Sequence, residues 1–212
     1  MAVTLTFDNG PAPGTTEWVL DLLAERELPA TFFLVGSMLQ RKGARDLAER
    51  AVAEGHWVGN HSMTHTTPLG AGLEPDQVRR EIEETQALLG DLVHERRFFR
   101  PFGGGGLIGR HLLSPAAVDV LCDGAYTCVL WNSVPRDWEE PEGWVAAALA
   151  DVDRLEHAVV VLHDLPTGAM DALPMFLDAL EAKETVVTQD FPTDVIAIER
   201  GAVRTLDGLV AR

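Results

Sequence analysis

Residues 2–11 read AVTLTFDNGP, an apolar run that stops at Asp8 and Asn9 and turns on a Gly-Pro pair. Similar short runs, rich in Val, Phe, Leu and Thr, recur along the chain. They predict strands at residues 2–7, 30–35, 56–59, 96–99, 126–131, 157–162, 185–188 and 194–198. The polar pair at the mouth of the first strand therefore directs attention to the residues that follow the other strands.

Stretches with helical periodicity separate several of these strands. Three of them are residues 15–27, with Trp18, Leu22 and Leu23 on one face, residues 76–92, with Val78, Ile82 and Leu89 on one face, and residues 171–183, with Pro174 near the start. Strands buried on both faces that alternate with helices indicate βα units and a mainly parallel sheet. Seven or eight strands in 212 residues predict a compact (β/α) barrel, with its active site at the carboxyl ends of the strands. Residues 1–212 are expected to form a single domain.

Composition excludes several classes of protein. Hydrophobic residues make up 46% of the chain and charged residues 24%, as in soluble globular proteins, and no run approaches the ~20 apolar residues of a membrane helix. A formal charge of -16 argues against nucleic acid and against an anionic membrane surface as partners. It favours a neutral or cationic substrate, such as a small molecule or a carbohydrate.

The N-terminal sequence and the cysteines predict the compartment. The chain begins MAVTLTFDN, without a basic leader or a small-residue cleavage site, so we expect a cytoplasmic protein. Cys122 and Cys128 have no CxxC partner, and we expect them to be two buried, reduced thiols.

Chemically capable side chains follow five of the predicted strands. They are Asp8 and Asn9 after the first, His61 and His65 after the third, Arg100 after the fourth, Asp137 and Trp138 after the fifth, and His163 after the sixth. Each has a structural alternative when taken alone: Asp8 caps a turn, and a single histidine after an apolar strand is usually part of the core. Five coincident placements at strand ends are hard to explain in that way.

The two histidines of the GNHSMTH segment point to a metal ion. At positions i and i+4 they are expected on one helical face, with Cβ atoms roughly 6 Å apart, close enough to share one ion. This spacing is common and weak by itself. The Gly59-Asn60 pair before it and the groups at the other strand ends strengthen the prediction.

Together these residues supply the parts of metal-assisted amide hydrolysis. Asp8 takes a proton from a water that the metal activates, and His61 and His65 hold the ion, which also polarises the carbonyl. Arg100 orients the base through a hydrogen bond, and His163 protonates the leaving amine. A backbone N–H of the glycine-rich run at 103–106 binds the oxyanion.

Five motifs in this order resemble those of the polysaccharide deacetylase family, also called carbohydrate esterase family 4 or the NodB homology domain. They are TFDNGP (6–11), HSMTH (61–65), FRPFGG (99–104), PRDW (135–138) and VLHD (161–164). The resemblance covers nearly the whole chain. It implies a distorted (β/α) barrel of seven or eight mostly parallel strands and a hydrolase of C–N bonds in non-peptide amides.

The same resemblance implies roles for individual residues. Asp8 is similar to the catalytic base, Arg100 to the arginine that positions it, and His163 to the general acid. His61 and His65 are similar to two ligands of a divalent metal, of which Zn²⁺ is the expected one. Trp138 and Leu162 would line the acyl pocket.

Three positions depart from the family's pattern. Asn9 stands where the third metal ligand is an aspartate, and its amide oxygen is a weaker ligand. The arginine motif is one residue shorter, which leaves open whether Phe102 or Gly103 supplies the oxyanion donor. Val134 replaces an aspartate, so Asp137 becomes the candidate that orients His163.

The sequence leaves three functions open. The first is metal-assisted N-deacetylation of an N-acetylated sugar or a related small molecule. The second is ring opening of a cyclic amide or imide, as with allantoin, with little or no dependence on metal. The third is a catalytically inactive, sugar-binding or regulatory member of the family. Neither the oligomeric state nor the exact substrate follows from the sequence.

Overall fold

The computed structural model of the chain describes residues 1–211 and consists of one curled sheet with helices packed around it. The strands are β1 (Ala2–Asp8), β2 (Thr31–Leu34), β3 (Trp57–Asn60), β4 (Phe98–Phe99), β5 (Thr127–Val129), β6 (His157–His163), β7 (Val186–Thr188), β8 (Ile196–Glu199) and β9 (Ala202–Val203). All eight predicted strands are present, and their ends lie within two residues of the prediction. The short strand β9 was not predicted.

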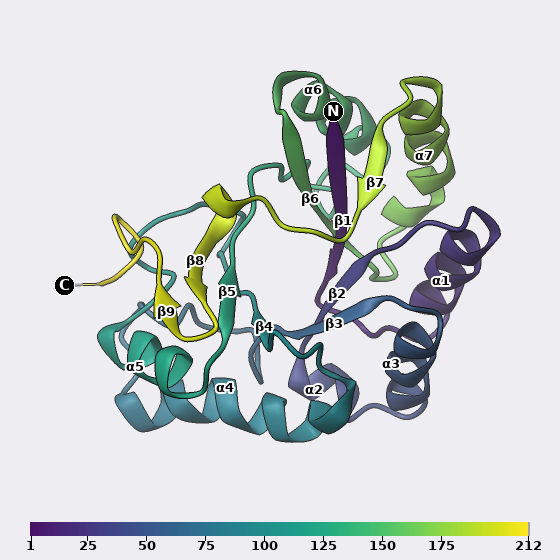
Figure 1. The fold of residues 1–212 in the computed structure, drawn as a ribbon. Helices are drawn as coiled ribbons and strands as arrows, with labels where there is room; N and C mark the ends of the chain where they lie inside the picture. The colour runs from purple at the N-terminus through teal and green to yellow at the C-terminus, as the bar shows by residue number, and fades with distance from the viewer. Residues whose placement is uncertain (212) are drawn as a thin grey trace.

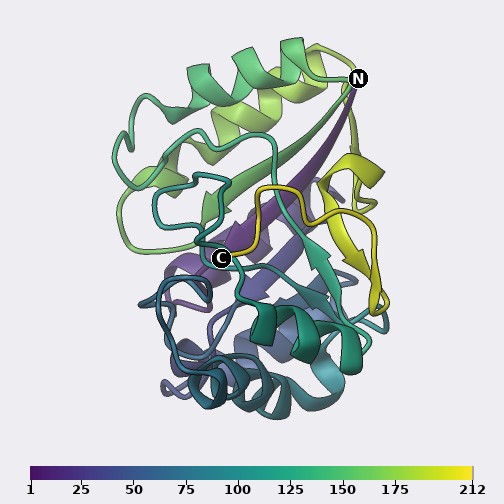
Figure 2. The same cartoon turned by 90° about the vertical axis from the view of Figure 1, so that its left-hand side faces the viewer.

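The helices cover the outside of the sheet (Figure 1). They are α1 (Thr15–Glu25), α2 (Gly36–Leu39), α3 (Ala44–Ala53), α4 (Pro75–Leu89), α5 (Pro115–Asp123), α6 (Trp144–Arg154) and α7 (Leu173–Ala182), with short 3₁₀ turns at Gly90–Leu92, Ala169–Ala172 and Thr193–Val195. The three predicted helices, α1, α4 and α7, are confirmed. Figure 2 shows α6 and α7 along one side of the sheet and α4 and α5 along the other.

The strand order is β6-β1-β2-β3-β4-β5-β8-β9, which confirms the predicted distorted, mostly parallel barrel. Two features distort it. Strand β1 pairs with β7 at its start and with β2 at its end, and β8 and β9 run antiparallel to their neighbours. The circle is closed by a single bridge from Ser133 to β6, where the N–H of Val161 donates to the Ser133 carbonyl over 3.0 Å.

Alternation along β1 separates the core from the site. Val3, Leu5 and Phe7 join the apolar cluster that packs under α1, α6 and α7, whereas Thr6 and Asp8 lie on the opposite face beside Arg100. A second cluster fills the space under α4 and α5 around β4, β5 and β8. The carboxyl ends of the parallel strands therefore meet at one edge, where the polar residues gather.

The helix faces follow their periodicity with one exception. Val78, Ile82 and Leu89 of α4 are fully buried, as predicted. In α1 the buried face runs through Val19 and Leu23. Trp18 falls at the edge of that face and is 37% exposed, so the prediction that it shares the face of Leu22 and Leu23 is wrong.

Two further findings concern the surface and the thiols. Within residues 1–211 no helix has the length and apolar character needed to cross a membrane. Both cysteines are free thiols; Cys128 is buried and Cys122 is partly exposed.

Candidate active site

Arg100 and Asp8 form a buried pair at the ends of β4 and β1. Nη1 of Arg100 donates to Asp8 Oδ1 over 2.8 Å and to Thr6 Oγ1 over 2.7 Å, and Nη2 donates to the Leu130 carbonyl over 3.2 Å. The cation also lies 4.0 Å from the centre of the Phe33 ring. Burial lowers the pKa of Arg100 and the charge of Asp8 opposes that shift, but a guanidinium stays protonated in proteins. One oxygen of Asp8 is thus fixed by Arg100.

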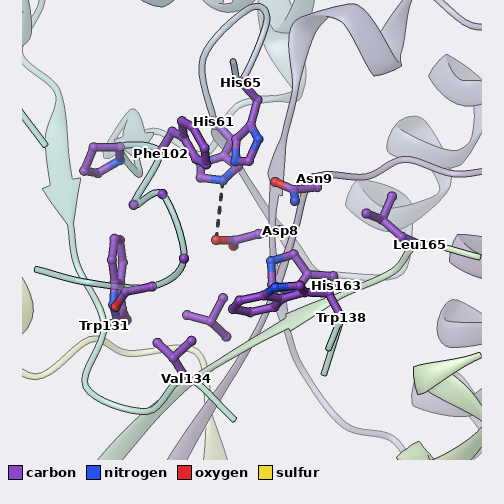
Figure 3. Close-up of a pocket in the computed structure, with 16 residues that line it drawn as sticks. Asp8, Asn9, His61, His65, Phe102, Trp131, Val134, Trp138, His163 and Leu165 are labelled. Atoms are coloured by element: carbon purple, nitrogen blue, oxygen red, sulfur yellow. Dashed lines mark hydrogen bonds and ion pairs between the residues drawn. The ribbon is translucent and has the colours of Figure 1, made fainter. Parts of the chain in front are cut away.

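The other oxygen of Asp8 faces the histidine pair (Figure 3). Asp8 Oδ2 lies 3.5 Å from Nε2 of His61. Burial lowers the pKa of His61 to about 3, so its imidazole is neutral and this contact is not an ion pair. Burial likewise lowers the pKa of His65 to about 3.

His61 and His65 meet in a loop, not on a helix, so the expected helical face is wrong. Ser62 and His65 have positive φ angles of 68° and 52°, which no α-helix allows. Glu81 of α4 holds the loop by accepting hydrogen bonds from the N–H groups of Met63 (3.0 Å) and Thr64 (2.9 Å). The turn still brings the two imidazole rings together, with their centres 4.6 Å apart.

His163 is held by Asp137 on the opposite wall. Its backbone N–H donates to Asp137 Oδ2 over 2.9 Å, and its ring Nδ1 lies 2.8 Å from Asp137 Oδ1. Burial lowers the pKa of His163, but the hydrogen bond and charge of Asp137 outweigh it and leave the pKa raised. The edge of the Trp138 ring lies against the imidazole, with the ring centres 4.8 Å apart.

A cavity of about 180 Å³ lies between these two walls. It is lined by Asp8, His61, His65, Phe102, Gly103 and Trp138. The prediction for Leu162 is wrong, because successive side chains of β6 alternate between faces and Leu162 points into the core under the helices. Val161, which shares the face of His163, lines the cavity instead.

The remaining apolar walls were not assigned from the sequence. Trp131, Val134 and Leu165 line the cavity alongside Trp138. Alternation from His163 would have identified Val161, but nothing in the local pattern marks Trp131 or Leu165. Both lie in irregular segments whose course depends on the closure of the barrel.

Residues 103–106, here called the glycine loop, cover one side of the cavity. Phe102, just before the loop, packs against His65, with the ring centres 4.0 Å apart. Gly103 lies directly on the Trp131 ring, since a Cβ at this position would come within 2.7 Å of the indole. The motif's shortening thus leaves both candidate oxyanion donors, Phe102 and Gly103, at the cavity wall.

The site's donor groups suit a divalent cation. Nδ1 of His61 donates to the Arg100 carbonyl over 2.8 Å, which leaves the lone pair of Nε2 free. Asn9 is the third group, and its side-chain oxygen is buried without a hydrogen-bond partner within residues 1–211. No three His, Cys, Asp or Glu side chains come together as a metal site in this part of the chain, and the Asn9 amide oxygen is a further candidate donor beside the two imidazoles. Two neutral imidazoles and an orphaned amide oxygen fit such an ion.

The arrangement combines a carboxylate and a histidine, each buried and each held by its own partner, on two sides of one cavity. A carboxylate of this kind takes a proton from water, and a histidine with a raised pKa gives one to a leaving group. The fold and the site therefore define a hydrolase with a barrel active site.

Comparison with known proteins names its class. The sequence profile described as Polysaccharide deacetylase matches residues 1–110. A chitooligosaccharide deacetylase of Rhizobium leguminosarum bv. trifolii is 36% identical over 170 residues, which are 76% of this chain and 71% of the relative. The chain belongs to the polysaccharide deacetylase family.

Solved structures agree with this assignment. A family 4 carbohydrate esterase from Streptomyces lividans, in complex with acetate, superposes with a TM-score of 0.74 at 28% identity, covering 93% of this chain and 96% of that one. A family 4 acetyl xylan esterase from Clostridium thermocellum, in complex with a cobalt ion, gives 0.73 at 27% identity over 89% and 87%. A family 4 pseudoenzyme from Bacillus anthracis gives 0.70 at 25% identity over 88% and 62%.

Proposed function

We propose that the protein is a metal-dependent N-deacetylase that releases acetate from an N-acetylated amino sugar. The observation that carries the proposal is the pair of proton-transfer groups, Asp8 backed by Arg100 and His163 backed by Asp137, on two sides of one cavity. A binding site for an uncharged sugar needs neither pair. The deacetylase named in the sequence comparison, which acts on a chitooligosaccharide, supports the substrate class.

His61, His65 and Asn9 would hold the divalent metal, with Zn²⁺ as the expected ion. When bound, it would polarise the substrate carbonyl and lower the pKa of the attacking water. The chain's own part begins at Asp8, whose Oδ2 accepts the proton of that water while Arg100 fixes Oδ1. A buried Arg100 also keeps the carboxylate from turning away from the cavity.

The acid half of the reaction belongs to His163. Asp137 holds its Nδ1, which leaves Nε2 to donate a proton to the amine nitrogen as the C–N bond breaks. A backbone N–H at Phe102 or Gly103 stabilises the oxyanion. The apolar side chains of Trp138 and Val161 surround the methyl group of the acetyl moiety and exclude water from it.

Two alternatives share the same cavity. The inactive reading is favoured by Asn9, which removes one charge from the ligand set, and by the likeness to a pseudoenzyme of this fold. The cyclic-amide hypothesis is also favoured by Asn9. Its neutral side chain would hold a metal ion weakly, which suits a reaction with little or no dependence on metal. A sugar-binding module needs neither Asp8 nor His163 for proton transfer. Ring opening of a cyclic amide would use the same base and acid, so the choice of substrate separates the two hydrolytic functions.

The test is acetate release by the purified protein, loaded with Zn²⁺ or Co²⁺. The substrates are N-acetylglucosamine, its short β-linked oligomers, allantoin and a cyclic imide. We expect acetate from the sugars, loss of that activity on chelation, and loss in Asp8→Asn, while the exposed control Asp46→Asn keeps it. Ring opening alone would establish the second function. Sugar binding without turnover on any substrate or metal would establish the third, and full activity after exhaustive chelation would remove the metal from the mechanism.

A further inference from the structure

The glycine loop holds a conformation that its own sequence does not enforce. Gly104, Gly105 and Gly106 have φ angles of 55°, 91° and 82°, in the region that favours glycine. Gly106 is also crowded, because a Cβ there would come within 2.6 Å of Val134. Four consecutive glycines permit this close packing, but they also give the free loop more conformations than any other sequence. Contacts from elsewhere must select the observed one.

Three side chains from other segments make those contacts, each on a different carbonyl of the loop. Nε2 of His111 donates to the Gly103 carbonyl over 3.0 Å, and the indole N–H of Trp131 donates to that of Gly106 over 2.8 Å. The guanidinium of Arg136 donates to the Gly105 carbonyl over 3.1 Å. In a trans peptide the N–H of the next residue points the opposite way. Fixing these carbonyls therefore fixes the direction of the N–H groups of Gly104, Gly106 and Leu107, and the anchored carbonyl of Gly103 restrains the residue that carries one of the two candidate oxyanion donors.

Arg136 extends this clamp to the acid side of the cavity. Its guanidinium donates to both oxygens of Glu139, over 2.8 and 2.6 Å, and lies 5.4 Å from the centre of the Trp138 ring. Trp138 in turn packs edge-on against His163. One cation thus joins the loop beside the histidine pair to the wall that carries the candidate acid.

We propose that His111, Trp131 and Arg136 are positioning residues, which lock the glycine loop so that the oxyanion donor at its start, the N–H of Phe102 or Gly103, is held in place before substrate arrives. The expected effect of these residues on the rate of acetate release rests on the proposed function. The clamp itself is a property of the free protein. None of the three side chains takes part in proton transfer, and none lies among the candidate metal ligands.

The experiment compares Arg136→Ala, Arg136→Lys, Trp131→Phe and His111→Ala with the wild-type protein and with Arg154→Ala. Arg154 is a matched control. Like Arg136 it is an exposed arginine that forms a salt bridge with an acidic residue three positions away, in this case Asp151, but it lies away from the cavity. The readouts are amide hydrogen exchange over residues 102–108 by mass spectrometry, and kcat and KM for acetate release from β-linked N-acetylglucosamine oligomers.

We expect Arg136→Ala and Trp131→Phe to speed exchange of the loop amides and to lower kcat by about tenfold each, with KM within about twofold, because an oxyanion donor acts in the transition state. Arg136→Lys should recover part of both losses, and Arg154→Ala should change neither. A lower melting temperature with unchanged kcat and exchange would overturn the proposal. If the wild-type protein releases no acetate, the proposed function fails, and exchange in the same variants alone decides whether the clamp exists.

Discussion

At the scale of single residues, Asn9 gives the most direct test of the proposed metal site. Within residues 1–211 its amide oxygen is buried without a hydrogen-bond partner, and it lines the same cavity as two neutral imidazoles. We expect Asn9→Asp to bind Zn²⁺ at least about tenfold more tightly, because a carboxylate adds a negative charge to the ligand set, and Asn9→Ala to bind it more weakly. Calorimetric titration of metal-free protein measures both.

The two variants also separate the functions. Equal affinity in Asn9→Ala and wild type would show that Asn9 is no ligand. If Asn9→Asp gains deacetylase activity that the wild-type protein lacks, then the native role lies outside deacetylation.

Asp137 sets the protonation of His163, and the sign of its effect on pH dependence follows directly. In the proposed mechanism His163 donates a proton, so we expect activity to be lost as the pH rises through the pKa of His163. The structure holds this pKa above its ordinary value through Asp137. Asp137→Asn should lower the pKa of His163 and move the alkaline limb of kcat/KM to lower pH, with the exposed Asp171→Asn as control. An alkaline limb that stays in place would assign it to another group.

Asp164 is a buried carboxyl group that the proposed mechanism does not use. It accepts a hydrogen bond from Thr16, while its Oδ1 has no partner within residues 1–211. Burial raises its pKa from 3.8 to about 6. The folded protein therefore binds more protons than the unfolded chain between these values, so stability falls as the pH rises from about 4 to about 6.

Asp164→Asn should remove this slope. At pH 7 the ionised carboxylate costs up to about 3 kcal/mol, from a shift of about two pKa units, and the variant should recover part of it. Urea unfolding between pH 4 and pH 7 measures the free energy of unfolding of both proteins. Parallel curves for the two would show that Asp164 does not titrate in this window.

At the scale of elements, the ends of the strands could be predicted and the loops that follow them could not. Asp8, Arg100 and His163 lie where their strands end, because an apolar run that stops at a polar residue marks both the strand and its edge. The turn that carries His61 and His65 depends on Glu81, eighteen residues beyond Met63, whose hydrogen bond has no local sequence signal. The choice of Leu162 failed for a different reason: strand alternation, which was available from the sequence, selects Val161.

Helix α4 therefore shapes the candidate metal site without touching it. Glu81→Ala removes the acceptor for two loop N–H groups and for the Thr64 hydroxyl, and should weaken Zn²⁺ binding by about tenfold, as loss of outer-shell partners does elsewhere. Glu81→Gln should lose less, since it keeps one acceptor oxygen. Glu83→Ala, on the same helix and paired with Arg79, is the control. Equal affinity in the Ala variants of Glu81 and Glu83 would show that the loop holds itself.

At the scale of the whole molecule, the barrel class followed from counting strands, whereas its closure did not. An isolated bridge at Ser133 joins the segment after β5 to β6. This segment then carries Val134 and Trp138 to the cavity wall and Asp137 to His163. One bridge leaves no periodic trace in a sequence. Nothing in the pattern therefore showed that Val134 would pack against Gly106.

The net charge predicts a property of the whole fold. With 33 acidic and 17 basic side chains, the compact state suffers repulsion that salt screens. We expect the melting temperature at pH 7 to rise by about 2–4 °C between 10 and 200 mM NaCl, which corresponds to about 1 kcal/mol for a protein of this size. Near the isoelectric point of about 4.7 the same salt step should have little effect. An equal response at both pH values would mean that salt acts through something other than net charge, and that the acidic helix faces are already balanced by local pairs such as Arg45 with Glu49.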